Sequence, residues 1–160
     1  MRLVIAAVGR LKDGPERELL ARYRERLAGL GKRVGLSPVA WHELAESKAA
    51  STNRRCAEEG DGLLKLARDA DAIIALDQRG KAFTSQGIAQ LLARLRDEGR
   101  STLAILVGGP DGLSPAVREA AHITLSLGAI TLPHGLARIV LAEQLYRAAT
   151  ILAGHPYHRE

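Results

Sequence analysis

Two short segments combine glycine, proline and small polar residues in the pattern of a ligand-binding loop. Residues 107–112 read VGGPDG, in which two glycines let a ligand approach the backbone closely and the proline fixes the turn. Residues 128–135 read GAITLPHG, whose polar groups are mostly backbone amides and carbonyls beside apolar side chains. The second loop suits a flat, largely apolar ligand such as adenine with a thioether or sulfonium tail. The first segment, taken alone, is also the sequence of a plain tight turn.

Neither segment has the spacing of the common nucleotide-binding motifs. VGGPDG lacks the G-x-G-x-x-G pattern of the dinucleotide fold, and the chain has no G-x-x-x-x-G-K-[ST] phosphate loop. We therefore do not expect an enzyme that depends on a nicotinamide or on a nucleoside triphosphate.

Two places carry side chains that can transfer protons or meet an anion. His134 starts the last helical segment, where it is a candidate general base or an ordinary histidine near a helix cap. In the terminal HPYHRE, Tyr157 can stack on a base and Arg159 can pair with a phosphate or an oxyanion. His155 and His158 can transfer protons near neutral pH. The two histidines lack a third nearby ligand, so we expect no metal site.

Positive charge is concentrated at the start of the chain. The formal net charge is +5 and the isoelectric point is near 9.8. All of the excess lies in residues 1–33, because the later part of the sequence balances its charges. Arginines 17, 22, 24 and 26 fall between the apolar positions of one predicted helix and form its outer face. Such a face suits a phosphate backbone, and a solvated Arg-rich helix is the alternative.

Apolar runs and turn residues divide the chain into alternating strands and helices. We expect strands at 2–9, 71–77, 101–109 and 122–127, and an edge or irregular stretch at 33–41 because of Pro38. The first expected helix begins after Asp13 as its cap and has Pro15 in its first turn. Four more helices are expected, from about Ser51 to Ala70, from Thr84 or Ser85 to Gly99, from Ser114 and Pro115 onward, and from about Gly135 to Ala153. Residues 78–83 are expected to form a loop.

The pattern is that of an α/β fold. Its strands do not alternate apolar and polar residues, as the strands of a sheet with one solvent-exposed face do. This predicts a mostly parallel sheet with helices on both faces. Ligands bind such sheets where the carboxyl ends of the strands and the following loops converge. We therefore expect the loops after residues 76, 107 and 127 to form one pocket.

The final helix carries more apolar surface than one sheet contact needs. Leu141 and Leu145 lie on one side, whereas Leu136, Val140 and Ile151 fall well away from it. This pattern predicts a second partner, most simply the same helix of a second copy in a homodimer. Deep burial within a monomer is the alternative.

Composition bounds the class of protein. The 160 residues are 46% hydrophobic and 26% charged, which is typical of one globular domain spanning 1–160. No run approaches the roughly 18 apolar residues of a membrane span, and the first ten residues do not fit a secretory signal, so a cytoplasmic protein is expected. Cys56 is the only cysteine, which excludes an internal disulfide and a cysteine metal cluster, and it receives no role.

Three segments resemble the ribosomal RNA large-subunit methyltransferase H family. They are LVGGPDGLSP at 106–115, LPHGLARIVLAEQLYRA at 132–148 and the terminal HPYHRE. The resemblance extends from VIAAVGRLK at the start to the last residue, is dense from about Leu103 onward and is loose across 35–70. This family belongs to the SPOUT methyltransferases. The resemblance implies an α/β sheet with a C-terminal trefoil knot, an obligate homodimer and S-adenosyl-L-methionine as methyl donor.

The resemblance also implies a substrate and a set of site residues. The family methylates N3 of a pseudouridine in a hairpin loop of 23S ribosomal RNA within the assembled ribosome. By motif, the cofactor would contact Leu76, Gly109 and the loop that consists of Gly128, Ala129, Ile130, Thr131, Leu132 and Pro133. Tyr157, His158 and Arg159 would be the catalytic residues near the target base, and the Arg-rich first helix would hold RNA. Arg159 is expected to stabilise the anion, with His158 or Tyr157 as proton acceptor or orienting group.

Two other functions fit parts of the sequence. The basic first helix also suits a non-enzymatic RNA-binding or ribosome-associated module, which would have no use for three converging loops. Another knotted methyltransferase that acts on transfer RNA fits the sequence outside the tail, and the tail argues against it.

Overall fold

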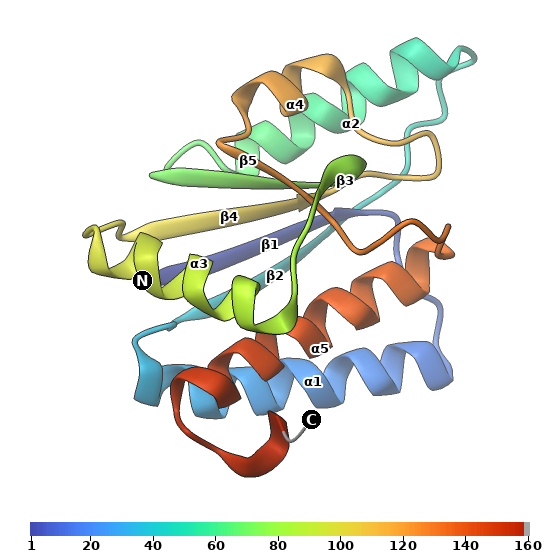
Figure 1. The fold of residues 1–160 in the computed structure, drawn as a ribbon. Helices are drawn as coiled ribbons and strands as arrows, with labels where there is room; N and C mark the ends of the chain where they lie inside the picture. The colour runs from blue at the N-terminus through green and yellow to red at the C-terminus, as the bar shows by residue number, and fades with distance from the viewer. Residues whose placement is uncertain (159–160) are drawn as a thin grey trace.

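The computed structural model describes residues 1–158, which form a five-stranded parallel sheet with helices on both faces (Figure 1). The strands are β1 (Arg2–Val8), β2 (Val39–Leu44), β3 (Ala72–Ala82), β4 (Thr102–Val107) and β5 (Ile123–Ser126). The helices are α1 (Pro15–Gly31), α2 (Thr52–Leu66), α3 (Ser85–Asp97), α4 (Pro115–Ala120) and α5 (His134–Leu152), with short 3-10 turns η1 (Lys32–Val34) and η2 (Pro156–His158). The expected α/β architecture is confirmed.

The strand order β2-β1-β4-β3-β5 places the most apolar strands in the centre of the sheet. Every paired neighbour is parallel. Along β1, Leu3 and Ile5 face one hydrophobic core, whereas Val4 and Ala6 face the other. Because both faces are buried, the strand reads as a continuous apolar run rather than an alternating one.

The helices form two unequal layers. The core on one face joins the sheet to α1, α3 and α5, and the core on the other face joins it to α2 and the short α4. Figure 1 shows α2 and α4 above the sheet and the other three helices below it. The carboxyl ends of the strands and their loops therefore meet at one edge, between the two layers.

Two strands differ from their sequence-based expectations. The strand expected at 33–41 begins only at Val39, because residues 32–34 form η1. The peptide bond between Ser37 and Pro38 is cis. It is an edge strand, as the proline predicts. The loop expected at 78–83 is wrong, since β3 continues to Ala82. Residues 77–80 are not paired with β5. Leu76 before them and Lys81 after them both lie opposite Leu125 of β5.

Two helix ends also differ. Asp13 is not the cap of α1, because Gly14 occupies that position without a side-chain hydrogen bond. Asp13 instead lies 3.5 Å from Arg17 as an exposed ion pair. Helix α2 ends at Leu66, four residues earlier than expected for a helix that reaches Ala70. Thr84, one of the two expected cap residues, caps α3, and Ser114, expected at the start of α4, caps that helix. Each side chain accepts a backbone N–H three residues later.

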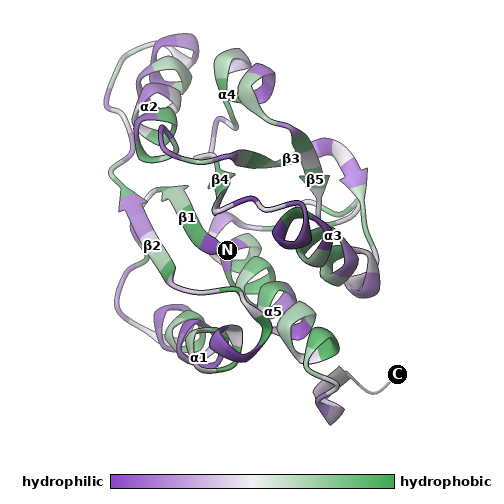
Figure 2. Cartoon of the chain, turned by 90° about the vertical axis from the view of Figure 1, so that its left-hand side faces the viewer, coloured by the Kyte–Doolittle hydropathy of each residue, from purple (hydrophilic) through white to green (hydrophobic). Residues whose placement is uncertain are grey.

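Helix α5 is apolar on several sides because it packs against more than the sheet. It contacts α1 and α3 as well as the strands, and Ile151 packs on the main core. Figure 2 shows hydrophobic colour along much of this helix. Part of its apolar surface is thus covered within the chain, while Leu136 stays 40% exposed. The homodimer and the trefoil knot both stay predictions.

Candidate active site

The three predicted loops converge on one cavity at the carboxyl edge of the sheet. Its volume is about 550 Å³, within the range of small-molecule sites. Six of the predicted cofactor residues line it: Leu76, Gly109, Gly128, Ile130, Thr131 and Leu132. Ala129 and Pro133 do not line it, although Pro133 is the N-terminal cap residue of α5. The cavity is lined by backbone and by apolar side chains, with a few charged groups at its rim.

The GGPDG segment folds tightly because its glycines allow close backbone contacts. The Gly112 N–H donates to the carbonyl of Gly109 at 3.0 Å, and Gly112 has a φ of +85° that favours glycine. A side chain at Gly108 would lie 2.7 Å from the carbonyl group of Gly112. A β-carbon at Gly109 would lie 2.9 Å from Glu59 Oε2 and 3.0 Å from Val8 Cγ1. These glycines therefore hold the backbone at the wall of the cavity.

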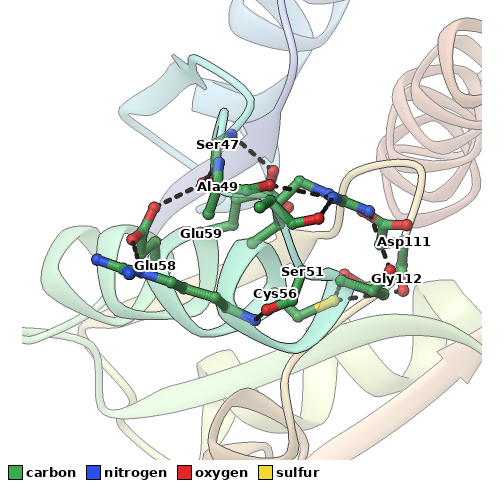
Figure 3. A network of polar contacts seen from close by, with 12 residues as sticks. Ser47, Ala49, Ser51, Cys56, Glu58, Glu59, Asp111 and Gly112 are labelled. Atoms are coloured by element: carbon green, nitrogen blue, oxygen red, sulfur yellow. Dashed lines mark hydrogen bonds and ion pairs between the residues drawn. The ribbon is translucent and has the colours of Figure 1, made fainter.

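Helix α2 supports this loop from behind (Figure 3). Arg55 donates through Nε to Asp111 at 2.7 Å, and its guanidinium also reaches the carbonyls of Ala49 and Ala50. The buried thiol of Cys56 donates to the Asp111 carbonyl at 3.5 Å. Burial raises the pKa of that thiol. Cys56 is thus part of the packing behind the cavity loop, which its polar sequence context did not reveal.

Glu59 is a buried carboxylate in the same support. Its side chain is 6% exposed, and Oε1 accepts the backbone N–H of Ser47 at 2.9 Å. The second oxygen has no hydrogen-bond partner among the described residues and faces Gly109. Sequence reasoning missed this residue because α2 reads as a polar surface helix. Its neighbour Gly60, an unfavourable residue inside a helix, is the signal that could have marked a close approach.

Charged side chains beside the cavity come from residues 77–80, where β3 is not paired with β5. Asp77 forms an ion pair with Arg118 of α4 at 3.3 Å. Its other oxygen accepts the backbone N–H of Arg79 at 2.9 Å, which shapes the residues that leave the ladder. Arg79 itself lines the cavity. The cavity therefore has Arg79 and the Asp77–Arg118 ion pair in a lining that is part polar and part apolar.

His134 lines the cavity at the first residue of α5, but its ring is already engaged. Its Nε2 lies 2.6 Å from the guanidinium of Arg138. Burial, followed by the charge of Arg138, lowers the pKa of His134 despite nearby Glu46 and Glu16. Burial and the neighbouring guanidinium thus both disfavour the charged form of the ring.

The tail lies at the other end of α5 from the cavity. Helix α5 has nineteen residues, but the tail folds back along it. Tyr157 contacts residues nine to thirteen positions after His134, or about 14–20 Å along the helix. Tyr157 packs on Tyr146 with 4.8 Å between ring centroids, beneath Arg147 at 5.0 Å. Its hydroxyl lies 3.3 Å from Glu143 Oε1. The structure does not bring Tyr157 to the cavity of its own chain.

The protonation of Tyr157 bears on its expected role. Burial, with the hydroxyl of Tyr23 and the carboxylate of Glu143, raises the pKa of Tyr157 to about 12. In this position the phenol can orient a partner, but it does not accept a proton near neutral pH. The side chain of His158, and Arg159 as a whole, lie outside the described residues.

The basic face of α1 is present as expected. Its arginines at 17, 22, 24 and 26 are exposed. Two of them stack on aromatic rings, with Arg24 5.4 Å from the centre of Trp41 and Arg26 6.0 Å from that of Tyr23. Such stacking holds guanidinium groups at the surface without neutralising their charge. The face remains available to an anionic partner.

Residues 1–158 lack two other features, a cluster of metal ligands and a membrane-spanning helix. This part of the chain holds no group of three or more His, Cys, Asp or Glu side chains arranged to ligate a metal ion. Among its helices, none combines the length and the apolarity that crossing a bilayer requires.

Known proteins resemble this chain in both sequence and fold. A family model described as "Predicted SPOUT methyltransferase" matches residues 1–158. A protein of Nitrobacter winogradskyi named ribosomal RNA large subunit methyltransferase H is 50% identical over 159 residues, which is 99% of each chain. A protein of the same name from Methylobacterium sp. (strain 4-46) is 52% identical over 159 residues, covering 99% of this chain and 98% of the relative.

Solved structures share the fold at low identity. A probable methyltransferase from Bordetella pertussis superposes with a TM-score of 0.53 at 14% identity, covering 92% of this chain and 95% of that one. A probable methylase family protein from Haemophilus influenzae gives 0.53 at 11% identity, over 99% of this chain and 70% of that one. With a full-length family match and relatives at half identity, this chain belongs to the ribosomal RNA large subunit methyltransferase H family of SPOUT methyltransferases.

Proposed function

We propose that this chain is a cytoplasmic methyltransferase that transfers a methyl group from S-adenosyl-L-methionine to N3 of a pseudouridine in 23S ribosomal RNA, within the assembled ribosome. The observation that carries the proposal is the meeting of three loops at one cavity, in a chain whose relatives bear the name of a large-subunit ribosomal RNA methyltransferase. Family membership supplies the reaction class, and the cavity supplies a place for the donor.

The cavity suits the proposed cofactor. Gly109 and the backbone of residues 128 and 130–132 can contact a flat heterocycle closely. Leu76, Ile130 and Leu132 offer apolar surface to it and to the thioether carbons. S-adenosyl-L-methionine supplies an already electrophilic methyl group when bound. The residues of this chain must then align that group with the target nitrogen and remove the N3 proton.

We propose that the tail acts on the cavity of a second copy. Tyr157 packs against Glu143, Tyr146 and Arg147, about 14–20 Å along α5 from His134, and it does not line the cavity of its own chain. In this conformation a tail residue would meet a cofactor across a subunit interface. The exposed Leu136 and the 71% exposed Ile130 lie near the cavity end of α5 and suit such an interface. A homodimer would thus complete each site with residues from both chains.

The chemistry gives the tail residues definite tasks. If the pKa of the N3–H group is about two units above the ambient pH, removing its proton to form the anion costs roughly 2.7 kcal/mol. A guanidinium beside the nitrogen would offset part of that cost, and Arg159 is the proposed stabiliser. His158 is the proposed proton acceptor, and Tyr157 the orienting group, because its raised pKa keeps the phenol protonated.

Methyl transfer to a mapped nucleotide tests the proposal. Purified protein is incubated with tritiated S-adenosyl-L-methionine and either assembled ribosomes or isolated ribosomal RNA from cells that lack this modification. We expect label at a single pseudouridine, with ribosomes the better substrate. Cofactor binding without label in 23S RNA would refute the assigned substrate. Binding of RNA through α1 without any affinity for the cofactor would favour a non-enzymatic RNA-binding module.

Mixed dimers test the shared site. One copy carries Arg159→Ala, which leaves the cavity intact, and the other carries Leu132→Trp, which fills the cavity and leaves the tail intact. Each homodimer should be inactive, whereas the purified heterodimer should regain up to half of the wild-type rate through its one complete site. A tail that serves its own chain predicts an inactive heterodimer.

A further inference from the structure

Arg138 is the most deeply buried charged side chain among the described residues, and it contacts His134 at the cavity. It is 2% exposed and lies one helical turn after His134 on α5. Its guanidinium donates to Glu43 Oε1 of β2 at 3.1 Å and to the backbone carbonyl of Val8 at the end of β1. These contacts fasten the first turn of α5 to the carboxyl ends of two strands. A fixed, always charged group therefore stands beside the His134 ring.

The contact with Arg138 determines which nitrogen of His134 carries the proton. A guanidinium has N–H donors and no acceptor, so the ring nitrogen 2.6 Å away must accept. A ring carbon could not approach so closely, which fixes Nε2 rather than Cε1 at this place. The proton of the neutral ring is then on Nδ1. Among the described residues, Nδ1 has no hydrogen-bond partner, and the ring lines the cavity.

Gly9 leaves room for this arrangement. A β-carbon there would lie 2.6 Å from His134 Nε2, 2.9 Å from the Arg138 guanidinium and 2.9 Å from Glu46 Oε1. The backbone of the β1 loop thus touches the ring nitrogen, the guanidinium and a carboxylate at once. A side chain at this position would have to displace the ring, the guanidinium or the carboxylate, so the contact between His134 and Arg138 requires glycine here.

We infer that Arg138 is a positioning residue that holds His134 as a neutral hydrogen-bond donor through Nδ1, for an oxygen acceptor on the bound methyl donor. The carboxylate and the ribose hydroxyls of S-adenosyl-L-methionine supply such acceptors. This role differs from that of a general base, because the nitrogen that would take a proton already accepts one hydrogen bond from a cation. The assignment of the acceptor rests on the proposed function, whereas the state of the ring does not.

The protonation state is measured directly by nitrogen NMR of the imidazole rings. The chain has five histidines, and the spectrum of His134→Gln identifies the resonances of His134 by their loss. We expect protonated Nδ1 and unprotonated Nε2 at neutral pH in the wild-type protein. Arg138→Met should give a mixture of tautomers, and Arg96→Met should leave the pattern unchanged. Arg96 is the matched control, since it donates to the Val34 carbonyl at 2.6 Å far from the cavity. A proton on Nε2 in the wild-type protein overturns the inference.

Two substitutions of His134 separate a donor from a base. Glutamine can accept from Arg138 through its amide oxygen and donate through its amide nitrogen, whereas leucine can do neither. Affinity for S-adenosylhomocysteine, measured by calorimetry, should fall about tenfold or more in His134→Leu and less than about threefold in His134→Gln. The rate constant at saturating cofactor should follow the same order, with an unchanged pH profile in His134→Gln.

The other outcomes contradict specific parts of the inference. If His134→Gln loses as much as His134→Leu, the donor role is wrong. If His134→Leu binds S-adenosylhomocysteine normally and loses only turnover, the acceptor is not on the cofactor. A wild-type protein that binds the cofactor but labels no RNA refutes the proposed function alone, since the NMR and binding measurements still decide the role of His134.

Discussion

Replacing Gly60 by alanine tests how closely α2 must approach the segment that ends the cavity loop. A β-carbon at Gly60 would overlap Ser114 Oγ, lie 2.9 Å from Ser114 Cβ and 3.3 Å from Val117 Cγ2. The hydroxyl of Ser114 caps α4 by accepting the Val117 N–H at 3.3 Å, so it cannot move away without cost. Overpacking of this kind costs about 1–3 kcal/mol.

Helix propensity opposes that cost and needs its own control. Alanine is favoured over glycine inside a helix by about 1 kcal/mol, so Gly60→Ala should change the free energy of unfolding by about 0 to −2 kcal/mol. Gly29 in α1 has open space where its β-carbon would be, and Gly29→Ala should stabilise by roughly 0.5–1 kcal/mol. The difference between the two variants, about 1–3 kcal/mol, reports the overlap alone.

Urea denaturation at one fixed protein concentration measures both variants. Fixed concentration matters because association of subunits would make the apparent stability depend on it. The melting temperatures should differ by about 3 °C for each kcal/mol. Affinity for S-adenosylhomocysteine should fall in Gly60→Ala and stay unchanged in Gly29→Ala. Equal stabilisation by both substitutions would refute the close approach of α2 and α4.

Three further predictions follow from single contacts. Because the pKa of His134 is lowered by burial and by Arg138, the unfolded chain binds that proton more tightly. The free energy of unfolding should therefore fall as the pH drops below about 6.5, and it should stop falling once the pH is below the pKa of His134 in the folded protein. In urea denaturation, His134→Gln should lack this contribution to the loss of stability in acid. In a spectrophotometric titration, Tyr157→Phe should remove a transition near pH 12. A β-carbon at Gly80 would lie 2.6 Å from the carbonyl of Thr124, so Gly80→Ala should cost about 1–3 kcal/mol, and unchanged stability would contradict the pairing of β3 with β5.

The sheet and its pocket were predictable because their signals are strong and local. Long apolar runs bounded by turn residues are typical of buried parallel strands, and the loops after such strands must share one edge. The continuation of β3 was not predictable in the same way. Gln78, Arg79, Gly80 and Lys81 form a polar stretch, and the later part pairs with β5 through backbone groups that leave no mark in the residue types.

The support of the cavity was harder to predict than its lining. Glu59 and Arg138 belong to residue types that are rarely buried, so each reads as a surface residue. Arg138 had one signal, since it falls on the same side of its helix as Leu141 and Leu145. A charge within an apolar stripe must find buried partners, and here these are a strand carbonyl, a carboxylate and an imidazole.

The position of the tail depends on the whole fold. The resemblance placed Tyr157 near the target base, because a resemblance assigns residues by role. The structure places it beside the middle of α5, packed on Tyr146 and outside the cavity of its own chain. No pattern within one chain indicates that a site is divided between copies, since the residue types are the same in either arrangement.

The separation of cavity and tail by α5 also limits how this chain can change in length. One residue inserted within α5 would turn everything after it through about 100° and advance it by about 1.5 Å, which would misdirect the tail without touching either end. The turn at 98–100 has no such constraint, because Gly99 has no neighbouring atoms where a side chain would be. We therefore expect insertions and deletions to be excluded from α5 and tolerated at that turn.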